Sequence, residues 1–155
     1  MKPSFAFDTS ALISLGHTEL INLIIENYNI IISKRILQEL KQINKGLDRD
    51  AISAKKWLKF SKIIKLKEAK DSKIGENELF EICQREKIPM VTDDIKATKK
   101  FKNKIEWIYS VHVVFLLYYK KIISKERALF SIEKMRTERS WKDNLISVTG
   151  RILFQ

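Results

Sequence analysis

Aspartates occupy two positions directly after apolar segments that have the composition of strands. Asp8 follows Phe5–Phe7, and the pair Asp93 and Asp94 follows Met90-Val91-Thr92. An open parallel sheet binds ligands at the carboxyl ends of its strands, and right-handed crossovers bring those ends to one edge. We therefore expect these carboxylates to lie near one another. For each aspartate taken alone, the simpler interpretation is a cap of the following helix.

Two glutamates share the apolar face of a predicted helix. Glu39 lies three residues after Ile36 and four before Ile43, and Glu76 lies three residues before Leu79. A carboxylate on the inner face of a helix needs a cation, a hydrogen-bond donor or a proton, because an isolated buried charge is costly. The structural alternatives are an ion pair between Glu39 and the arginine four residues earlier, and a favourable helix N-terminal position for Glu76.

Convergence of these acidic groups would create a strongly negative site. Two full charges about 5 Å apart repel by roughly 3 kcal/mol at an effective dielectric constant of about 20. A set formed by Asp8, Glu39, Glu76 and Asp94 would therefore bind protons or a cation. Oxygen ligands favour the hard ions Mg²⁺ and Mn²⁺ over zinc or copper. An ion with open coordination positions holds water that can attack a phosphodiester.

Strand-like and helix-like segments alternate along the chain. The predicted strands are Phe5–Phe7, Asn29–Ile32, Ile63–Leu66, Pro89–Thr92 and Ile105–Tyr109. The first predicted helix has its apolar positions between Leu12 and Ile24, and the second is capped by Ser33. Further helices are predicted at about 51–60, 71–86, 111–121 and 125–136, and a final amphipathic segment follows Trp141. This order predicts a single domain over residues 1–155, an α/β three-layer α/β/α sandwich whose central, mostly parallel sheet has about five strands.

The composition limits the classes of protein to consider. With 155 residues, 45% hydrophobic and 32% charged, the chain can bury the core of one domain. The formal net charge of +11 attracts polyanions such as nucleic acid, although a lysine-rich host composition explains it equally well. The single cysteine allows no intrachain disulfide and no cysteine-based zinc site. The apolar run Val111–Tyr119 is too short to cross a bilayer, so we expect a soluble cytoplasmic protein with no membrane partner.

Four short motifs, in order, resemble those of PIN domains. Asp8-Thr9-Ser10 resembles the opening D-x-S/T motif, and Glu39 resembles the second acidic motif. Gly75-Glu76-Asn77-Glu78 is similar to the G-E-x-E variant of the third motif, and Thr92-Asp93-Asp94 is similar to the T-x-D fourth motif. The resemblance extends over about Phe5 to Tyr109.

The resemblance implies a divalent-metal ribonuclease that uses Mg²⁺ or Mn²⁺ and acts on RNA. Asp8, Glu39, Glu76 and Asp94 would bind the metal or position the attacking water. Ser10 would form a hydrogen bond within the site, and Asp93 would contribute more weakly. Small stand-alone members are often toxins of the VapC type, which implies an antitoxin as the protein partner. The third position is glutamate here, where many of these toxins have aspartate.

Two other functions compete with this hypothesis. A PIN-like RNA-binding or interaction module without catalytic activity would keep the fold and the basic surface. A doubly wound domain that binds a nucleotide, or acts as a phosphatase, is a weaker hypothesis, because the chain has neither G-x-G-x-x-G nor a P-loop and contains only four glycines.

Several other side chains are expected to be structural. His17 and His112 lack an i, i+4 partner for zinc, Cys83 lies on an apolar helix face, and Trp141 is expected to pack on the sheet rather than stack on a base. An aromatic group is expected in the core, with a homodimer face as the alternative: Phe115, Leu116, Tyr118 and Tyr119. Five lysines after the fourth motif are expected either to be solvated or to contact phosphate: Lys96, Lys99, Lys100, Lys102 and Lys104.

Overall fold

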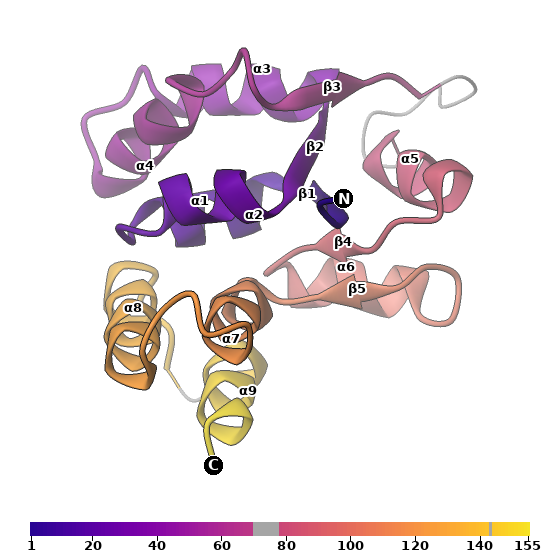
Figure 1. The fold of residues 1–155 in the computed structure, drawn as a ribbon. Helices are drawn as coiled ribbons and strands as arrows, with labels where there is room; N and C mark the ends of the chain where they lie inside the picture. The colour runs from indigo at the N-terminus through magenta and orange to yellow at the C-terminus, as the bar shows by residue number, and fades with distance from the viewer. Residues whose placement is uncertain (70–77, 143) are drawn as a thin grey trace.

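A five-stranded parallel sheet forms the centre of the computed structural model, which describes residues 1–69, 78–142 and 144–155 (Figure 1). The strands are β1 (Ser4–Phe7), β2 (Asn29–Ser33), β3 (Lys65–Lys67), β4 (Met90–Val91) and β5 (Trp107–Ile108). Their order is β3-β2-β1-β4-β5, and every neighbouring pair is parallel. In chain order, β2 and β3 are added on one side of β1, and β4 and β5 are added on its other side. The point at which the order reverses, between β1 and β4, is where open α/β sheets bind their ligands.

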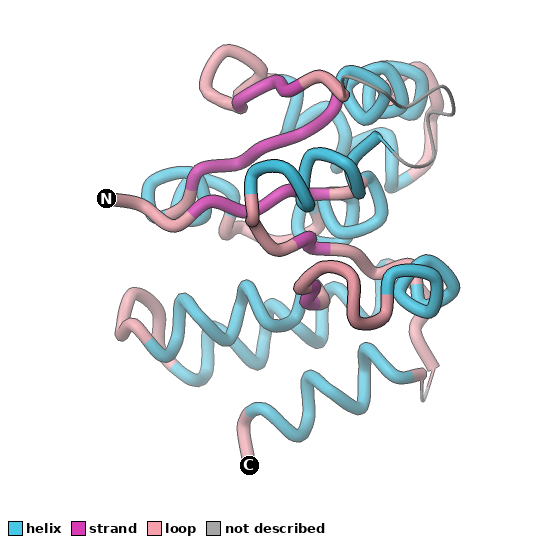
Figure 2. The backbone as a smooth tube through the Cα atoms, turned by 90° about the vertical axis from the view of Figure 1, so that its right-hand side faces the viewer, coloured by secondary structure: helices cyan, strands magenta, loops and turns pink. Residues whose placement is uncertain are grey.

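Helices cover both faces of this sheet. The helices of the described residues are α1 (Thr9–Gly16), α2 (Ile21–Asn27), α3 (Lys34–Ile43), α4 (Arg49–Leu58), α5 (Glu78–Glu86), α6 (Ile95–Phe101), α7 (Ser110–Tyr119), α8 (Lys125–Glu138) and α9 (Leu145–Leu153). Helix α5 packs against β1, β2 and β4 on one side, and α1 lies on the other side with α4 and α7 packed against it (Figure 1). Figure 2 shows the strands side by side, with helices in front of them and behind them. The predicted three-layer α/β/α fold is therefore confirmed.

The central strands are apolar on both faces, as a covered parallel sheet requires. In β1, Ala6 and Phe7 are fully buried, and in β2 the run Ile30–Ile32 is buried. The edge strand β3 is different, since its two lysines alternate with the exposed Leu66. Charged side chains on an edge strand oppose pairing with another chain.

The strand predictions differ from the structure mainly at their ends. The third strand begins at Lys65, and Ile63 and Ile64 lie in the preceding turn, because only Lys65–Lys67 lie in register with β2. The fourth and fifth strands pair over two residues each, which is shorter than predicted.

The helix predictions need two corrections. The single helix predicted after Asp8 is two helices, because the Thr18 hydroxyl donates to the Leu15 carbonyl and accepts from the Leu20 amide, which ends α1. Helix α6 was not predicted as an element, although its cap, Asp94, was recognised as a candidate. The predicted helix start at Asp71 lies outside the described residues.

Helix α1 is held in place by α4. The Trp57 indole is fully buried, and its Nε1 donates a hydrogen bond of 2.6 Å to the Leu12 carbonyl. The Ser53 hydroxyl donates to the Ile13 carbonyl over 2.7 Å. The helices approach closely at Gly16, where an added Cβ would lie 1.8 Å from the Ser53 Oγ. These contacts fix the position of α1, and therefore of the residue that caps it, Asp8.

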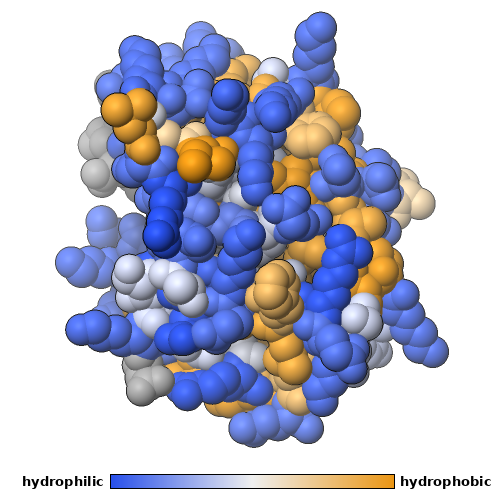
Figure 3. All heavy atoms as spheres, turned by 90° about the vertical axis from the view of Figure 1, so that its left-hand side faces the viewer, coloured by the Kyte–Doolittle hydropathy of each residue, from blue (hydrophilic) through white to orange (hydrophobic). Residues whose placement is uncertain are grey.

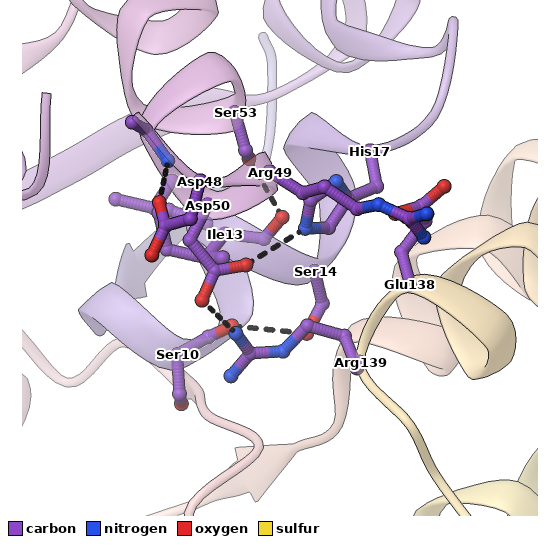
Figure 4. Close-up of polar contacts among 12 residues, drawn as sticks. Ser10, Ile13, Ser14, His17, Asp48, Arg49, Asp50, Ser53, Glu138 and Arg139 are labelled. Carbon is purple, nitrogen blue, oxygen red and sulfur yellow. Dashed lines mark hydrogen bonds and ion pairs between the residues drawn. The ribbon is translucent and has the colours of Figure 1, made fainter. Parts of the chain in front are cut away.

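A cluster of charged side chains connects the end of α8 to α1 and α4. Asp50 on α4 accepts from His17 Nε2 over 3.0 Å and from Arg139 Nη1 over 3.1 Å (Figure 4). Arg49 binds Glu138 over 3.0 Å in the same place. His17 is buried here, as its predicted structural role requires.

The other side chains expected to be structural are at least partly buried, with the exception of Tyr119. His112 Nδ1 accepts from the Tyr109 amide at the start of α7, and Trp141 is buried. Cys83 is also buried, and burial raises the pKa of its thiol to about 12, which leaves it protonated and unreactive. In the aromatic group of α7, Phe115, Leu116 and Tyr118 pack against the core, but the Tyr119 side chain is 72% exposed because it lies on the outer face of the helix end.

The surface is mostly hydrophilic, with hydrophobic side chains scattered among the charged ones on the face drawn in Figure 3. No helix in residues 1–69, 78–142 or 144–155 has the length and apolar character needed to cross a membrane.

Candidate active site

A pocket of about 510 Å³ opens at the reversal point of the sheet. Three carboxylates line it: Asp8, which follows β1, Glu39 on α3, and Asp94, which caps α6. Its cationic side chains are Arg35, Lys96 and Lys100. Its remaining lining residues are Thr9, Ser10, Ser33, Ile36, Leu79, Met90, Ala97 and Phe101. The structure thus brings together three of the acidic residues selected from the sequence.

Asp8 is the most tightly held of these carboxylates. Its Oδ1 accepts hydrogen bonds of 2.6 Å from both the backbone N–H and the hydroxyl of Ser10, and its Oδ2 accepts one of 2.6 Å from the Thr92 hydroxyl. Burial raises the pKa of Asp8, and the hydrogen bonds from Ser10 and Thr92 oppose this rise without cancelling it. Among the described residues, no lysine or arginine forms an ion pair with Asp8. The described residues therefore leave this desolvated carboxylate without a cationic partner.

Glu39 is already engaged on both oxygens. Its Oε1 accepts from Arg35 Nε over 2.9 Å, and its Oε2 accepts from the Thr9 hydroxyl. The ion pair with Arg35 is the structural alternative that the helix spacing predicted. Both partners of this ion pair are about 40% exposed, at 41% for Arg35 and 39% for Glu39, so exchange with another cation is sterically open.

The two adjacent aspartates point in different directions. Asp94 lines the pocket, and its Oδ1 accepts from the Ala97 amide over 3.0 Å. Asp93 is turned toward the start of α7, where Ser110 donates to it from the backbone over 2.9 Å and from the hydroxyl over 2.6 Å. Burial raises the pKa of Asp93, and the nearby charge of Asp8 adds to the rise. Of the two aspartates, only Asp94 lines the pocket.

Two hydroxyl groups join the Asp8 carboxylate to the backbone of Asp93 and Asp94. The Ser10 hydroxyl donates to Asp8 and accepts from the Asp93 amide over 2.9 Å. The Thr92 hydroxyl donates to Asp8 and accepts from the Asp94 amide over 3.1 Å. Sequence reasoning assigned no role to Thr92 or to Thr9, although both stand inside the D-x-S/T and T-x-D motifs.

A family profile described as a PIN domain matches residues 4–148. The chain belongs to the PIN-domain family. A search of curated proteins found no match. PIN domains are generally nucleases that act on RNA, usually with divalent metal ions, and they are often paired with antitoxins.

The donor chemistry of this PIN domain fits a hard divalent ion, because all three acidic groups of the pocket offer carboxylate oxygens. The distances between these carboxylates, however, do not yet form a metal site. In the part of the chain that the structure describes, no three acidic, histidine or cysteine side chains lie close enough to hold one ion. Glu76, the fourth predicted ligand, lies outside the described residues.

Proposed function

We propose that this PIN domain is a ribonuclease that binds Mg²⁺ or Mn²⁺ through Asp8, Asp94, Glu39 and Glu76 and hydrolyses phosphodiester bonds in RNA. The observation that carries the proposal is the desolvated Asp8, which has no cationic partner among the described residues and lies in a pocket that two further carboxylates line. A charge in that position is costly, and a divalent ion would offset the cost. RNA as the substrate follows from the family and agrees with the net charge of +11.

The side chains of the pocket would have separate roles in hydrolysis. A bound ion would acidify a water molecule and offset charge on the phosphoryl oxygens. Ser10 and Thr92 hold the Asp8 carboxylate in one orientation, so that it needs no reorganisation to act as a ligand. Arg35, released from Glu39, would offer its guanidinium to a phosphate, a group that it can bind through two parallel hydrogen bonds.

Metal dependence is the direct test of this function. We expect the purified protein to cleave labelled single-stranded RNA with Mn²⁺ or Mg²⁺, to stop in EDTA and to resume when Mn²⁺ is restored in excess. A gel or fluorescence assay measures the rate. Cleavage that continues unchanged in EDTA would show that the carboxylates do not act through a metal.

Arg35 competes with a metal ion for Glu39, so its removal should tighten metal binding. An exposed ion pair contributes about 0.2–1 kcal/mol, and Arg35→Gln is therefore expected to lower the Kd for Mn²⁺ by a factor of about 1.4 to 5. Isothermal titration calorimetry measures the change. The matched control is Lys34→Gln, which removes a neighbouring positive charge that does not line the pocket. An equal change in both variants would mean that only the overall charge matters.

An inactive RNA-binding module is the second candidate, and two observations favour it. Arg35 already neutralises Glu39, and the described residues contain no ready three-ligand group. This alternative predicts no heat of Mn²⁺ binding in calorimetry, together with RNA binding that weakens as salt increases.

The proposal extends to the setting in which the protein acts. We propose that residues 1–155 form one domain that acts in the cytoplasm as the toxin of a toxin–antitoxin pair. A short neighbouring gene for a small DNA-binding protein would support this role. Its absence would favour housekeeping RNA processing.

A further inference from the structure

The lysines that follow the fourth motif are not equivalent in the folded chain. Five of them occur between residues 96 and 104, but only Lys96 and Lys100 line the pocket. They stand four residues apart on α6 and therefore lie on the same face of that helix. Lys99 and Lys102 are exposed and are not among the lining residues.

Neither of the two pocket lysines has an acidic partner among the described residues, whereas the third pocket cation, Arg35, is paired with Glu39. Like charges at an i, i+4 spacing repel each other and destabilise a helix. The pair thus presents to one cavity two positive charges that no described carboxylate pairs with, and an anion placed between them would remove the repulsion.

The rest of the pocket restricts which anion fits. Apolar side chains form part of the lining: Ile36, Leu79, Met90 and Phe101. The carboxylates of Asp8, Glu39 and Asp94 would oppose the binding of a small free anion, which makes no further contacts to offset the repulsion. A nucleotide unit of RNA combines an anionic phosphate with a base that can lie against apolar side chains.

We propose that Lys96 and Lys100 form a phosphate-binding pair that holds the backbone of the RNA substrate beside the carboxylates of the pocket. The identity of the ligand as RNA rests on the proposed function. Lysine contacts phosphate as a point charge, so the pair would position the strand without reading its sequence. Lys99 and Lys102 would then belong to the general basic surface.

Two charge-matched double variants test the pair. Lys96→Gln with Lys100→Gln and Lys99→Gln with Lys102→Gln each remove two positive charges from exposed positions in the same short stretch of chain. Fluorescence anisotropy of the full-length protein with a labelled single-stranded RNA, in EDTA and at several salt concentrations, measures binding while metal-dependent hydrolysis is suppressed.

For the pocket variant we expect binding about tenfold weaker at 100 mM salt. The slope of log K against log salt should become shallower by about 1.4, which corresponds to two lost phosphate contacts at about 0.7 each. The control variant should change both quantities much less. Equal losses in the two variants, or no RNA binding by the unmodified protein, would overturn the proposal. Because no cleavage is measured, RNA binding that depends on the pair supports it even where the metal-dependent activity is absent.

Discussion

Replacement of Asp8 by asparagine is expected to lower RNA cleavage about 100-fold or more. Substitution of a residue that only hydrogen-bonds to a metal ligand typically lowers metal affinity or activity about 10- to 100-fold. Asp8 is proposed as a ligand itself, so its loss should cost at least as much. The amide keeps the shape of the side chain, and its oxygen can still accept from Ser10. The Thr92 hydroxyl, which now donates to Asp8, can accept from the new NH₂ group.

The same substitution should stabilise the protein at neutral pH. Burial raises the pKa of Asp8, so the folded state favours the protonated carboxyl. The resulting stability is fully present below the ordinary carboxyl pKa of about 4 and is lost as pH rises through the raised value. Asparagine carries no charge at any pH, so the Tm of the variant should equal or exceed that of the unmodified protein at pH 7. Asp93 titrates in both proteins, but the loss of the Asp8 charge removes one cause of its raised pKa and so adds to the expected stabilisation at pH 7.

Asp48→Asn is the matched control. Asp48 caps α4 with an extended backbone and accepts from the Ala51 amide over 2.9 Å, but it is exposed and lies outside the pocket. We expect Asp48→Asn to leave cleavage unchanged. Melting curves from pH 4 to pH 8 measure the effect on stability, and initial cleavage rates measure the effect on activity. Cleavage retained by Asp8→Asn would contradict the role assigned to Asp8. A Tm of this variant below that of the unmodified protein at pH 7 would contradict it as well.

Replacement of Trp57 by alanine is expected to have the largest effect on stability. Removal of a buried tryptophan side chain costs about 3–5 kcal/mol through lost burial and the cavity that remains. The Leu12 carbonyl would also lose its indole donor. At about 2–4 °C per kcal/mol for a chain of this size, the Tm should fall by roughly 10 °C. Thermal unfolding followed by circular dichroism, and denaturant titration for the free energy, measure the loss.

Two comparisons separate packing from hydrogen bonding at Trp57. Trp57→Phe keeps most of the volume but lacks the Nε1 donor, so it should cost clearly less than alanine. Trp107→Ala removes an indole that is only partly buried, and it should also cost less. Equal effects of the two alanine variants would mean that the α1–α4 contact does not depend on Trp57 in the way described. Because α1 carries Asp8 at its start, Trp57→Ala should also weaken Mn²⁺ binding at temperatures where the protein is still folded.

The local chemistry of the sequence was sufficient to predict most of the elements. Short runs of β-branched and aromatic residues specify the buried strands, and Ser33 caps α3 through a hydrogen bond to the Ile36 amide, as its position indicated. Element ends were less predictable. Thr18 breaks a continuous apolar pattern through side-chain hydrogen bonds, and β3 begins at Lys65 only because β2 lies beside it.

By itself, the sequence indicated that Asp8, Asp93 and Asp94 follow strands and that Glu39 shares a helix stripe with Ile36, because periodicity and strand ends depend on neighbouring residues. Only the tertiary structure decided what each of them meets. It turned Asp94 toward the pocket and Asp93 toward Ser110, paired Glu39 with Arg35, and selected Lys96 and Lys100 from five similar lysines. These outcomes depend on how β4, α3, α6 and α7 approach one another. Contacts between residues distant in the chain are formed by packing, and the spacing of residues along the chain does not specify them.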